Sequence, residues 1–95
     1  MYISGGLTLD LQTRRATASG AAVELTTTEF DLLAHLMRRP DRVFTREELL
    51  GEVWGYPAGT ATRTVDVHVA QVRTKIGAAA RLRTVRGVGY AIERA

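Results

Sequence analysis

The chain contains no cysteine, which excludes a disulfide framework and any zinc site built on thiolates. Only two histidines occur in 95 residues, and no set of nucleophile, base and orienting residue typical of an enzyme emerges. The longest apolar runs are too short to cross a membrane, and residues 1–10 lack the pattern of a signal peptide. The sequence therefore favours a cytoplasmic protein that is not an enzyme, and it indicates neither a cofactor nor a metal site.

Ninety-five residues, 45% hydrophobic and 24% charged, suffice for one domain around a single core. The net charge of +3 is unevenly distributed along the chain. Residues 1–62 carry six basic and eight acidic side chains, whereas residues 63–95 carry seven basic and two acidic ones, a net of +5. Positive charge gathered in one third of a chain is typical of a nucleic-acid-binding face, although a solvated basic surface has the same composition.

Residues 1–25 are expected to form a small antiparallel sheet. The stretches GLTLDL, RRATASG and AAVEL have alternating or β-compatible patterns and are separated by Gly, Thr and Ser. Ser19-Gly20 is the best hairpin turn among them. One face of such a sheet would pack on the helices that follow.

A first helix is expected after residue 26. Thr26 and Glu29 have the spacing of a capping box, and Pro40 ends the helix. The apolar stripe between them is formed by Phe30, Leu33, Ala34 and Met37. His35 lies off the apolar stripe, so we expect it to be exposed rather than a ligand or catalytic base.

A second helix repeats this pattern. Thr45 and Glu48 form a second capping box, and Gly55 suits the helix C-terminus. The Gly- and Pro-containing loop at residues 55–61 is longer than the turn of a minimal helix-turn-helix.

TRTVDVHVAQVRTKIG, residues 62–77, predicts a third helix with two different faces. An apolar stripe at i, i+4, i+7 and i+11 is formed by Val65, Val69, Val72 and Ile76. The opposite face carries Arg63, Val67, Ala70, Gln71 and Thr74, and its flanks carry His68, Arg73 and Lys75. A helix that packs its valines on the core must present the opposite face outward.

The C-terminal stretch RLRTVRGVGYAIERA predicts a hairpin within residues 82–93. Residues 82–85 and 88–92 have the patterns of two strands, with Arg86 at or beside the tip. We expect Gly87 and Gly89 to serve as backbone that turns tightly.

The order of sheet, two helices, loop, basic third helix and hairpin predicts one α+β domain over residues 1–95. It is the layout of a winged helix-turn-helix, with a sheet at 1–25, three helices within 26–77 and a wing at 82–93. The outward face of the third helix fits the major groove of DNA, where Arg63 and Gln71 donate hydrogen bonds and Val67 and Thr74 contact thymine methyl groups. Phosphate oxygens would be bound by His68, Arg73 and Lys75, and the minor groove would be entered by Thr84 and Arg86.

Four stretches, LTTTEFDLLAHL, TREELLGEVWG, RTVDVHVAQVRTKI and RTVRGVGY, resemble the C-terminal effector domain of OmpR/PhoB-type response regulators. The similarity runs over residues 7–92. It implies a four-stranded N-terminal sheet, a three-helix core and a hairpin wing that together bind promoter double-stranded DNA, usually as two copies head-to-tail on direct repeats. It also implies control by a phosphorylated receiver domain, absent from this chain, and by a sensor histidine kinase, with a loop at 55–61 that can contact RNA polymerase.

The resemblance also assigns roles to individual residues. Positions that contact phosphates in the family are occupied here by Trp54, Arg63, His68, Arg73, Thr84 and Tyr90. Positions that face bases or enter the minor groove are occupied by Val67, Gln71 and Arg86. Many relatives have two consecutive basic residues where this chain has Ala70 and Gln71, and Gln prefers adenine where Arg prefers guanine. Asp66, near a helix N-terminus, is interpreted as structural.

Alternatives remain at this point. Trp54 and Tyr90 also suit packing against the core. The whole domain could be a winged helix that contacts another protein, which predicts an apolar face on the third helix. Val67 and Ala70 fit that alternative, whereas the arginines of the third helix and the wing favour DNA.

Overall fold

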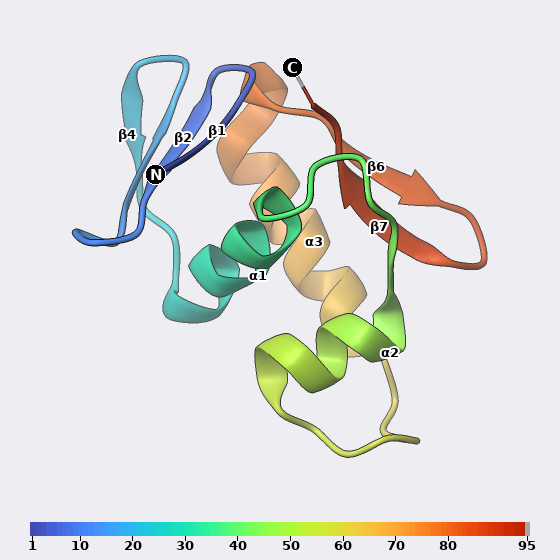
Figure 1. The fold of residues 1–95 in the computed structure, drawn as a ribbon. Helices are drawn as coiled ribbons and strands as arrows, with labels where there is room; N and C mark the ends of the chain where they lie inside the picture. The colour runs from blue at the N-terminus through green and yellow to red at the C-terminus, as the bar shows by residue number, and fades with distance from the viewer. Residues whose placement is uncertain (95) are drawn as a thin grey trace.

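The first 23 residues of the computed structural model, which describes residues 1–94, form a four-stranded antiparallel sheet (Figure 1). Its strands follow the chain in the order β1 (Tyr2–Ser4), β2 (Leu7–Asp10), β3 (Arg15–Ala18) and β4 (Ala21–Val23). The turn between β3 and β4 is at Ser19 and Gly20, whose φ angles are 52° and 83°, which confirms the predicted hairpin. Strand β1 is too short to show an alternating pattern, and the fourth strand of this sheet was implied by the family resemblance alone.

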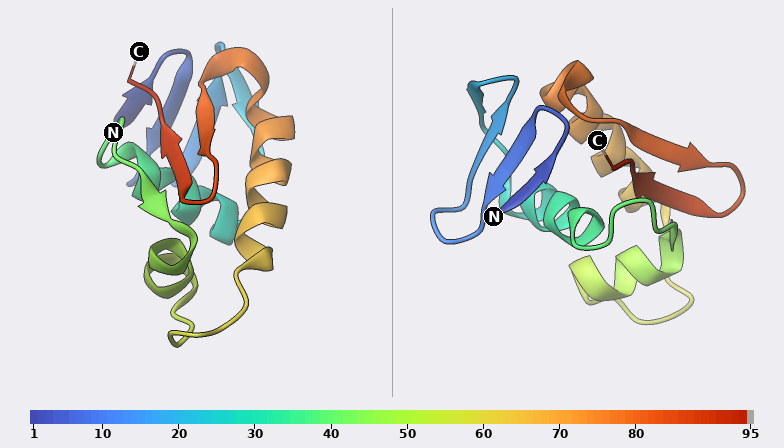
Figure 2. Two further views of the ribbon diagram at one scale, coloured as in Figure 1. Left: turned by 90° about the vertical axis from the view of Figure 1, so that its right-hand side faces the viewer. Right: turned by 45° about the horizontal axis from the view of Figure 1, so that its top comes forward.

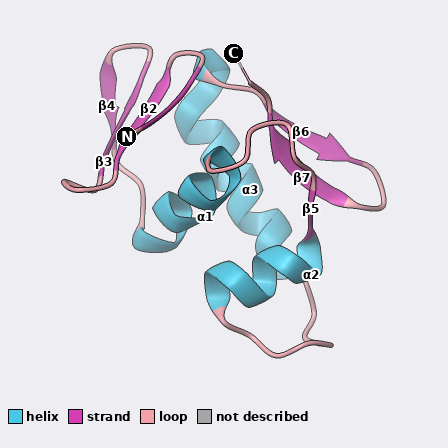
Figure 3. Ribbon diagram, in the orientation of Figure 1, coloured by secondary structure: helices cyan, strands magenta, loops and turns pink. Residues whose placement is uncertain are grey.

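The three predicted helices are present (Figure 3). Helix α1 spans Thr27–Met37, α2 spans Arg46–Leu49 and continues as the π-helical turn η1 (Leu50–Trp54), and α3 spans Arg63–Ile76. Both capping boxes are formed, because each threonine accepts from the backbone of its glutamate and each glutamate accepts from the backbone of its threonine. Gly55 ends η1 with a φ of 72°, as the sequence predicted.

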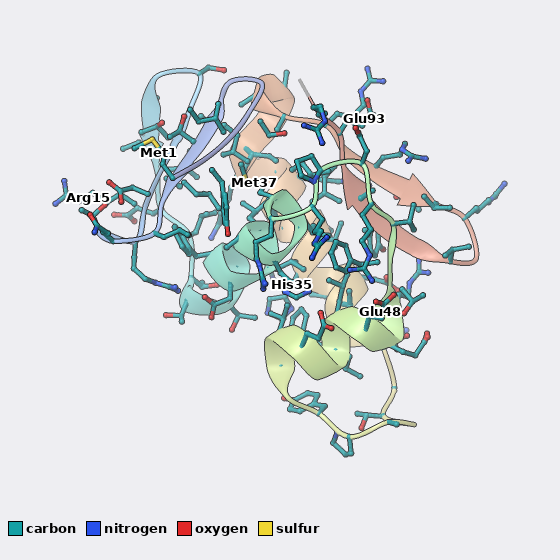
Figure 4. The ribbon with its side chains drawn as sticks, in the orientation of Figure 1. Met1, Arg15, His35, Met37, Glu48 and Glu93 are labelled. Atoms are coloured by element: carbon teal, nitrogen blue, oxygen red, sulfur yellow. The ribbon has the colours of Figure 1, made fainter. Side chains whose placement is uncertain are left out.

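The expectation of an exposed His35 is wrong. Its side chain, labelled in Figure 4, is 15% exposed. Its ring packs edge-on against Phe44 with the ring centroids 4.9 Å apart. Its Nε2 atom faces the Glu52 carboxylate of η1. The reason is that α1 is covered on more than one side: Leu32 and Leu36, off the predicted stripe, are also fully buried.

A second sheet contains the predicted hairpin and one strand that the sequence did not reveal. Strands β6 (Leu82–Val85) and β7 (Gly89–Ile92) form the hairpin, and the two-residue strand β5 (Phe44–Thr45) pairs with the other edge of β7. The hairpin turn closes through a hydrogen bond from the Val88 amide to the Val85 carbonyl, 2.9 Å long, and Gly87 has a φ of 72°. Figure 2 shows this hairpin projecting beside α3.

Residue 89 must be a glycine for a different reason from the tight turn that the sequence predicted. It lies in β7 rather than in the turn, opposite Thr45 of β5. A Cβ atom at this position would overlap the carbonyl oxygen of Phe44 and lie 2.9 Å from the Thr45 Cα atom. A side chain at residue 89 is therefore excluded by the close approach of β5.

The helices lie between the N-terminal sheet and the hairpin (Figure 1). The predicted stripe of α3 is confirmed, since Val65, Val69, Val72 and Ile76 are at most 3% exposed. A 3₁₀ turn, η2 (Gly77–Ala79), follows α3, and its Ala79 carbonyl accepts a 2.7 Å hydrogen bond from the Gly6 amide. The end of α3 is thus fixed to the turn between β1 and β2. No helix within residues 1–94 is long and apolar enough to span a membrane.

Candidate nucleic-acid interface

The outward face of α3 is uncovered. Because the valine stripe is buried, the opposite residues point to solvent, and they are Arg63, Val67, Ala70, Gln71 and Thr74. Val67 is 46% exposed, a high value for a large apolar side chain on an ordered helix. The Thr74 hydroxyl donates a 3.1 Å hydrogen bond to the Ala70 carbonyl within the helix. The structure therefore brings together the residues that the sequence placed on one face.

Arg73 connects α3 to the wing. Its Nε and Nη2 atoms donate to the Leu82 carbonyl at 3.1 and 2.7 Å, and Nη2 also donates to the Thr84 hydroxyl at 2.7 Å. These bonds use one edge of the guanidinium and leave the N–H groups of Nη1 for another ligand. Arg73 and Thr84, predicted separately, thus form one unit that holds β6 against α3, while Arg86 is exposed in the hairpin turn.

Tyr90 does not lie on the candidate face. It is 4% exposed, and its hydroxyl donates a 2.5 Å hydrogen bond to Asp66 Oδ1, which also accepts from Arg46 Nε at 2.7 Å. Burial and the nearby Asp66 carboxylate raise the pKa of Tyr90. Burial alone would raise the pKa of Asp66, but the hydrogen bonds from Tyr90 and Arg46 outweigh it, and the net direction is down. The burial of Tyr90 and its hydrogen bond to Asp66 favour the packing alternative over the predicted phosphate contact.

The structural interpretation of Asp66 agrees with this network. Its partners are not the backbone of its own helix, however, but side chains 20 and 24 residues away, Arg46 and Tyr90. The network joins α2, α3 and β7 behind the outward face of α3. It positions the helix relative to the wing, with Tyr90 buried and the Asp66 carboxylate partly open to solvent.

His68 and Trp54 form a half-buried pair on the other flank of α3. The His68 Nδ1 atom lies 2.8 Å from the Thr64 carbonyl, and the imidazole ring meets the Trp54 indole edge-on with centroids 5.1 Å apart. Since a carbonyl only accepts, Nδ1 carries the proton and Nε2 is the ring atom left for another ligand. Trp54 therefore orients His68 and also packs against the core.

Lys75 has a partner that the sequence did not reveal. Its Nζ atom lies 2.6 Å from Oε1 of Glu29, the capping-box carboxylate of α1, whose side chain is only 1% exposed. A buried carboxylate requires a countercharge, and Lys75 supplies it. Lys75 is therefore turned toward α1, and its ammonium group is engaged by Glu29, which argues against the predicted phosphate contact.

Sequence comparison gives one family and many relatives. The family described as "Transcriptional regulatory protein, C terminal" matches residues 20–92. The transcriptional regulatory protein VxrB of Vibrio cholerae is 49% identical over 88 residues, 93% of this chain and 36% of that protein. The sensory transduction protein RegX3 of Mycobacterium leprae is 44% identical over 94 residues, 95% of this chain and 48% of that protein. The chain thus spans between about one third and one half of these relatives.

Comparison with solved structures gives domains of the same architecture. The DNA-binding domain of Klebsiella pneumoniae RstA, solved in complex with the RstA box, superposes with a TM-score of 0.85 and 32% identity. That match covers 95% of this chain and 93% of the other. The DNA-binding domain of the response regulator AdeR, solved with an intercistronic region, has a TM-score of 0.84 and 28% identity over the full length of both chains.

Proposed function

This chain belongs to the family of C-terminal domains of OmpR/PhoB-type transcriptional regulatory proteins, and we propose that it binds double-stranded promoter DNA sequence-specifically as the effector domain of a two-component regulator. The observation that carries the proposal is the uncovered face of α3 with the exposed Arg86 on the hairpin beside it. The two similar domains solved with DNA support it.

In this proposal α3 lies in the major groove, which is about 12 Å wide, and the β6–β7 hairpin follows into the adjacent minor groove. Arg63 lies in the first turn of α3, and Val67, Gln71 and Thr74 face base edges. Arg86 enters the minor groove, where arginine is attracted by the negative potential. Phosphates are bound at the rim, by Trp54, His68 Nε2, Arg73 Nη1 and Thr84. Lys75 and Tyr90 are left out because their polar groups are engaged within the domain.

The relatives are longer than this chain, and further partners are proposed for the full-length regulator. We propose that the full-length regulator carries a receiver domain controlled by a sensor histidine kinase, acts in the cytoplasm, and places two copies head-to-tail on direct repeats. The loop at 55–61 is proposed to contact RNA polymerase. The exposed Tyr56 supports this, because its side chain is 48% exposed on a loop at the end of η1.

Arg86→Ala is expected to weaken binding to a specific duplex by about 1–3 kcal/mol, roughly 5- to 150-fold. Arg86 is exposed in the hairpin turn and has no side-chain hydrogen bond to any group within residues 1–94, so the variant should unfold at the same temperature as the wild type. The measurement is equilibrium binding to a duplex selected from a random DNA pool. The pool is needed because the operator is unknown.

Arg15→Ala is the matched control for this variant. It removes the same charge from an exposed position on β3, in the N-terminal sheet on the far side of the helices (Figure 4). We expect it to change the affinity less than twofold. Equal effects of the two substitutions would show that only net charge matters and would contradict the proposed position of the wing.

A further inference from the structure

The exposed face of α3 contains a strip without charge. Val67, Ala70, Gln71 and Thr74 follow one another at i, i+3, i+4 and i+7, and all four are exposed. This spacing makes them neighbours along one side of the helix. We call these four residues the α3 strip. An uncharged strip in the most basic third of the chain requires an explanation of its own.

The hydrogen-bonding capacity of the α3 strip is concentrated in one side chain. Val67 and Ala70 present only methyl groups, and the Thr74 hydroxyl has already given its proton to the Ala70 carbonyl. What Thr74 offers a ligand is its methyl group and a lone pair. Gln71 alone therefore carries both a donor and an acceptor, with apolar groups on either side of it.

Two of the cations that flank the α3 strip, Arg73 and Lys75, are engaged by other groups, and Arg63 lies one turn before the strip. Arg73 donates to Leu82 and Thr84 of the wing, and Lys75 is paired with the buried Glu29. The bidentate contact that recognises guanine in the major groove needs the donors of an arginine or lysine. The Gln71 amide instead presents one donor nitrogen beside an acceptor oxygen, so the two adjacent guanine acceptors O6 and N7 would be matched less well than adenine N7 and N6.

An A·T pair matches both the hydrogen-bonding groups and the apolar groups of the α3 strip. Adenine presents the N7 acceptor and the N6 donor that one glutamine amide satisfies together, and thymine presents a 5-methyl group. Resting on the proposed function, we infer that the α3 strip selects A·T pairs at the centre of each half-site. Gln71 binds adenine, and Val67, Ala70 and Thr74 bury thymine methyl groups next to it. These residues determine specificity, whereas Arg63, Arg73 and Arg86 supply affinity.

The first experiment is selection of bound duplexes from a random pool with the wild type, Gln71→Ala and Gln71→Arg. The wild type should select adjacent A·T pairs with an adenine at one fixed position. Gln71→Arg should shift that position toward guanine by about 5- to 150-fold in relative preference, and Gln71→Ala should lose the preference there. Wild-type motifs centred on G·C, or one motif for all three proteins, would overturn the inference.

The second experiment isolates the methyl groups. In the selected duplex, thymines of the central pairs are replaced one at a time with deoxyuridine, which lacks only the 5-methyl group. Each methyl that is buried should cost about fourfold in affinity when removed. Val67→Ala should reduce this thymine-to-uracil ratio, whereas Gln71→Ala should keep it. Ratios near one at every position for the wild type would show that the α3 strip does not touch thymine.

These outcomes are separable from failure of the proposed function. A domain that binds duplexes in a salt-dependent way but selects no A·T centre would overturn only the inference about the α3 strip. A folded domain that enriches no duplex from the pool would overturn DNA binding itself and favour an α3 strip that docks on a protein.

Discussion

Replacing Gly89 with alanine is expected to destabilise the domain by about 3 kcal/mol and to lower its unfolding temperature by roughly 12–24 °C. The new methyl group would overlap the Phe44 carbonyl oxygen and lie 2.8 Å from the Phe44 carbonyl carbon, both backbone atoms that no change of rotamer can move. Relief requires β5 to leave β7, and β5 leads directly into the capping box of α2. Thermal unfolding followed by circular dichroism measures the effect.

Gly87→Ala is the control for this prediction, two residues away in the same hairpin. Gly87 has a φ of 72°, and a Cβ atom there would meet nothing within 4 Å. Its substitution should cost only the strain of a left-handed alanine, about 1–2 kcal/mol. If Gly89→Ala were no more destabilising than Gly87→Ala, the approach of β5 would not be the reason for a glycine at residue 89.

Glu29→Ala is expected to cost about 2–4 kcal/mol of unfolding free energy, because it leaves the Thr26 amide without its acceptor, removes the partner of Lys75 and empties a buried position. Glu29 accepts hydrogen bonds from the Thr26 amide at 2.9 Å and from Lys75 at 2.6 Å. Glu29→Gln should cost less, since an amide oxygen can still accept from Thr26. Urea denaturation of the three proteins ranks them, and equal stability of the wild type and Glu29→Ala would contradict this role.

Glu29 should also make the free energy of unfolding depend on pH. Burial alone would raise the pKa of Glu29, but hydrogen bonds from Lys75 and Thr26 outweigh it and hold this pKa below the ordinary value of 4.5. A carboxyl group with a lowered folded-state pKa stabilises the protein above its unfolded pKa and loses that contribution as pH falls toward the lowered value. Acid should therefore narrow the stability difference between the wild type and Glu29→Gln; a constant difference from pH 7 to pH 3 would contradict this.

The sequence predicted those features that depend on neighbouring residues. Both capping boxes span three residues, and the valine stripe of α3 repeats within one helix, so local spacing was sufficient. The outward face followed from the stripe, because a helix with one buried side must expose the other. The position of Arg86 in the turn followed equally from the alternation of β6 and β7.

Features that depend on distant residues were missed. Lys75 meets Glu29 across 46 residues and Tyr90 meets Asp66 across 24, and no local pattern reports either contact. Strand β5 has two residues and therefore no periodicity, yet it explains both Gly89 and the burial of His35 through Phe44. Lys75 and Tyr90, which we leave out of the proposed interface, each have a polar partner on another element.

The central claim is that the outward face of α3 and the wing bind DNA, and a salt titration of binding tests it most directly. The duplex is the one selected from the pool, and a scrambled duplex of equal length serves as the reference. Three arginines, Arg63, Arg73 and Arg86, remain on this surface after Lys75 is assigned to Glu29. Each of these cations, placed against the DNA, releases about one condensed counterion, which predicts a slope of about −3 for log K against log salt and a loss of roughly 40-fold between about 50 and 200 mM.

The selected duplex should also bind at least about 10³-fold more tightly than the scrambled one. In Arg86→Ala the slope should become shallower by about 0.9. An affinity that stays constant between low and moderate salt, or that is equal for the two duplexes, would contradict the proposed interface.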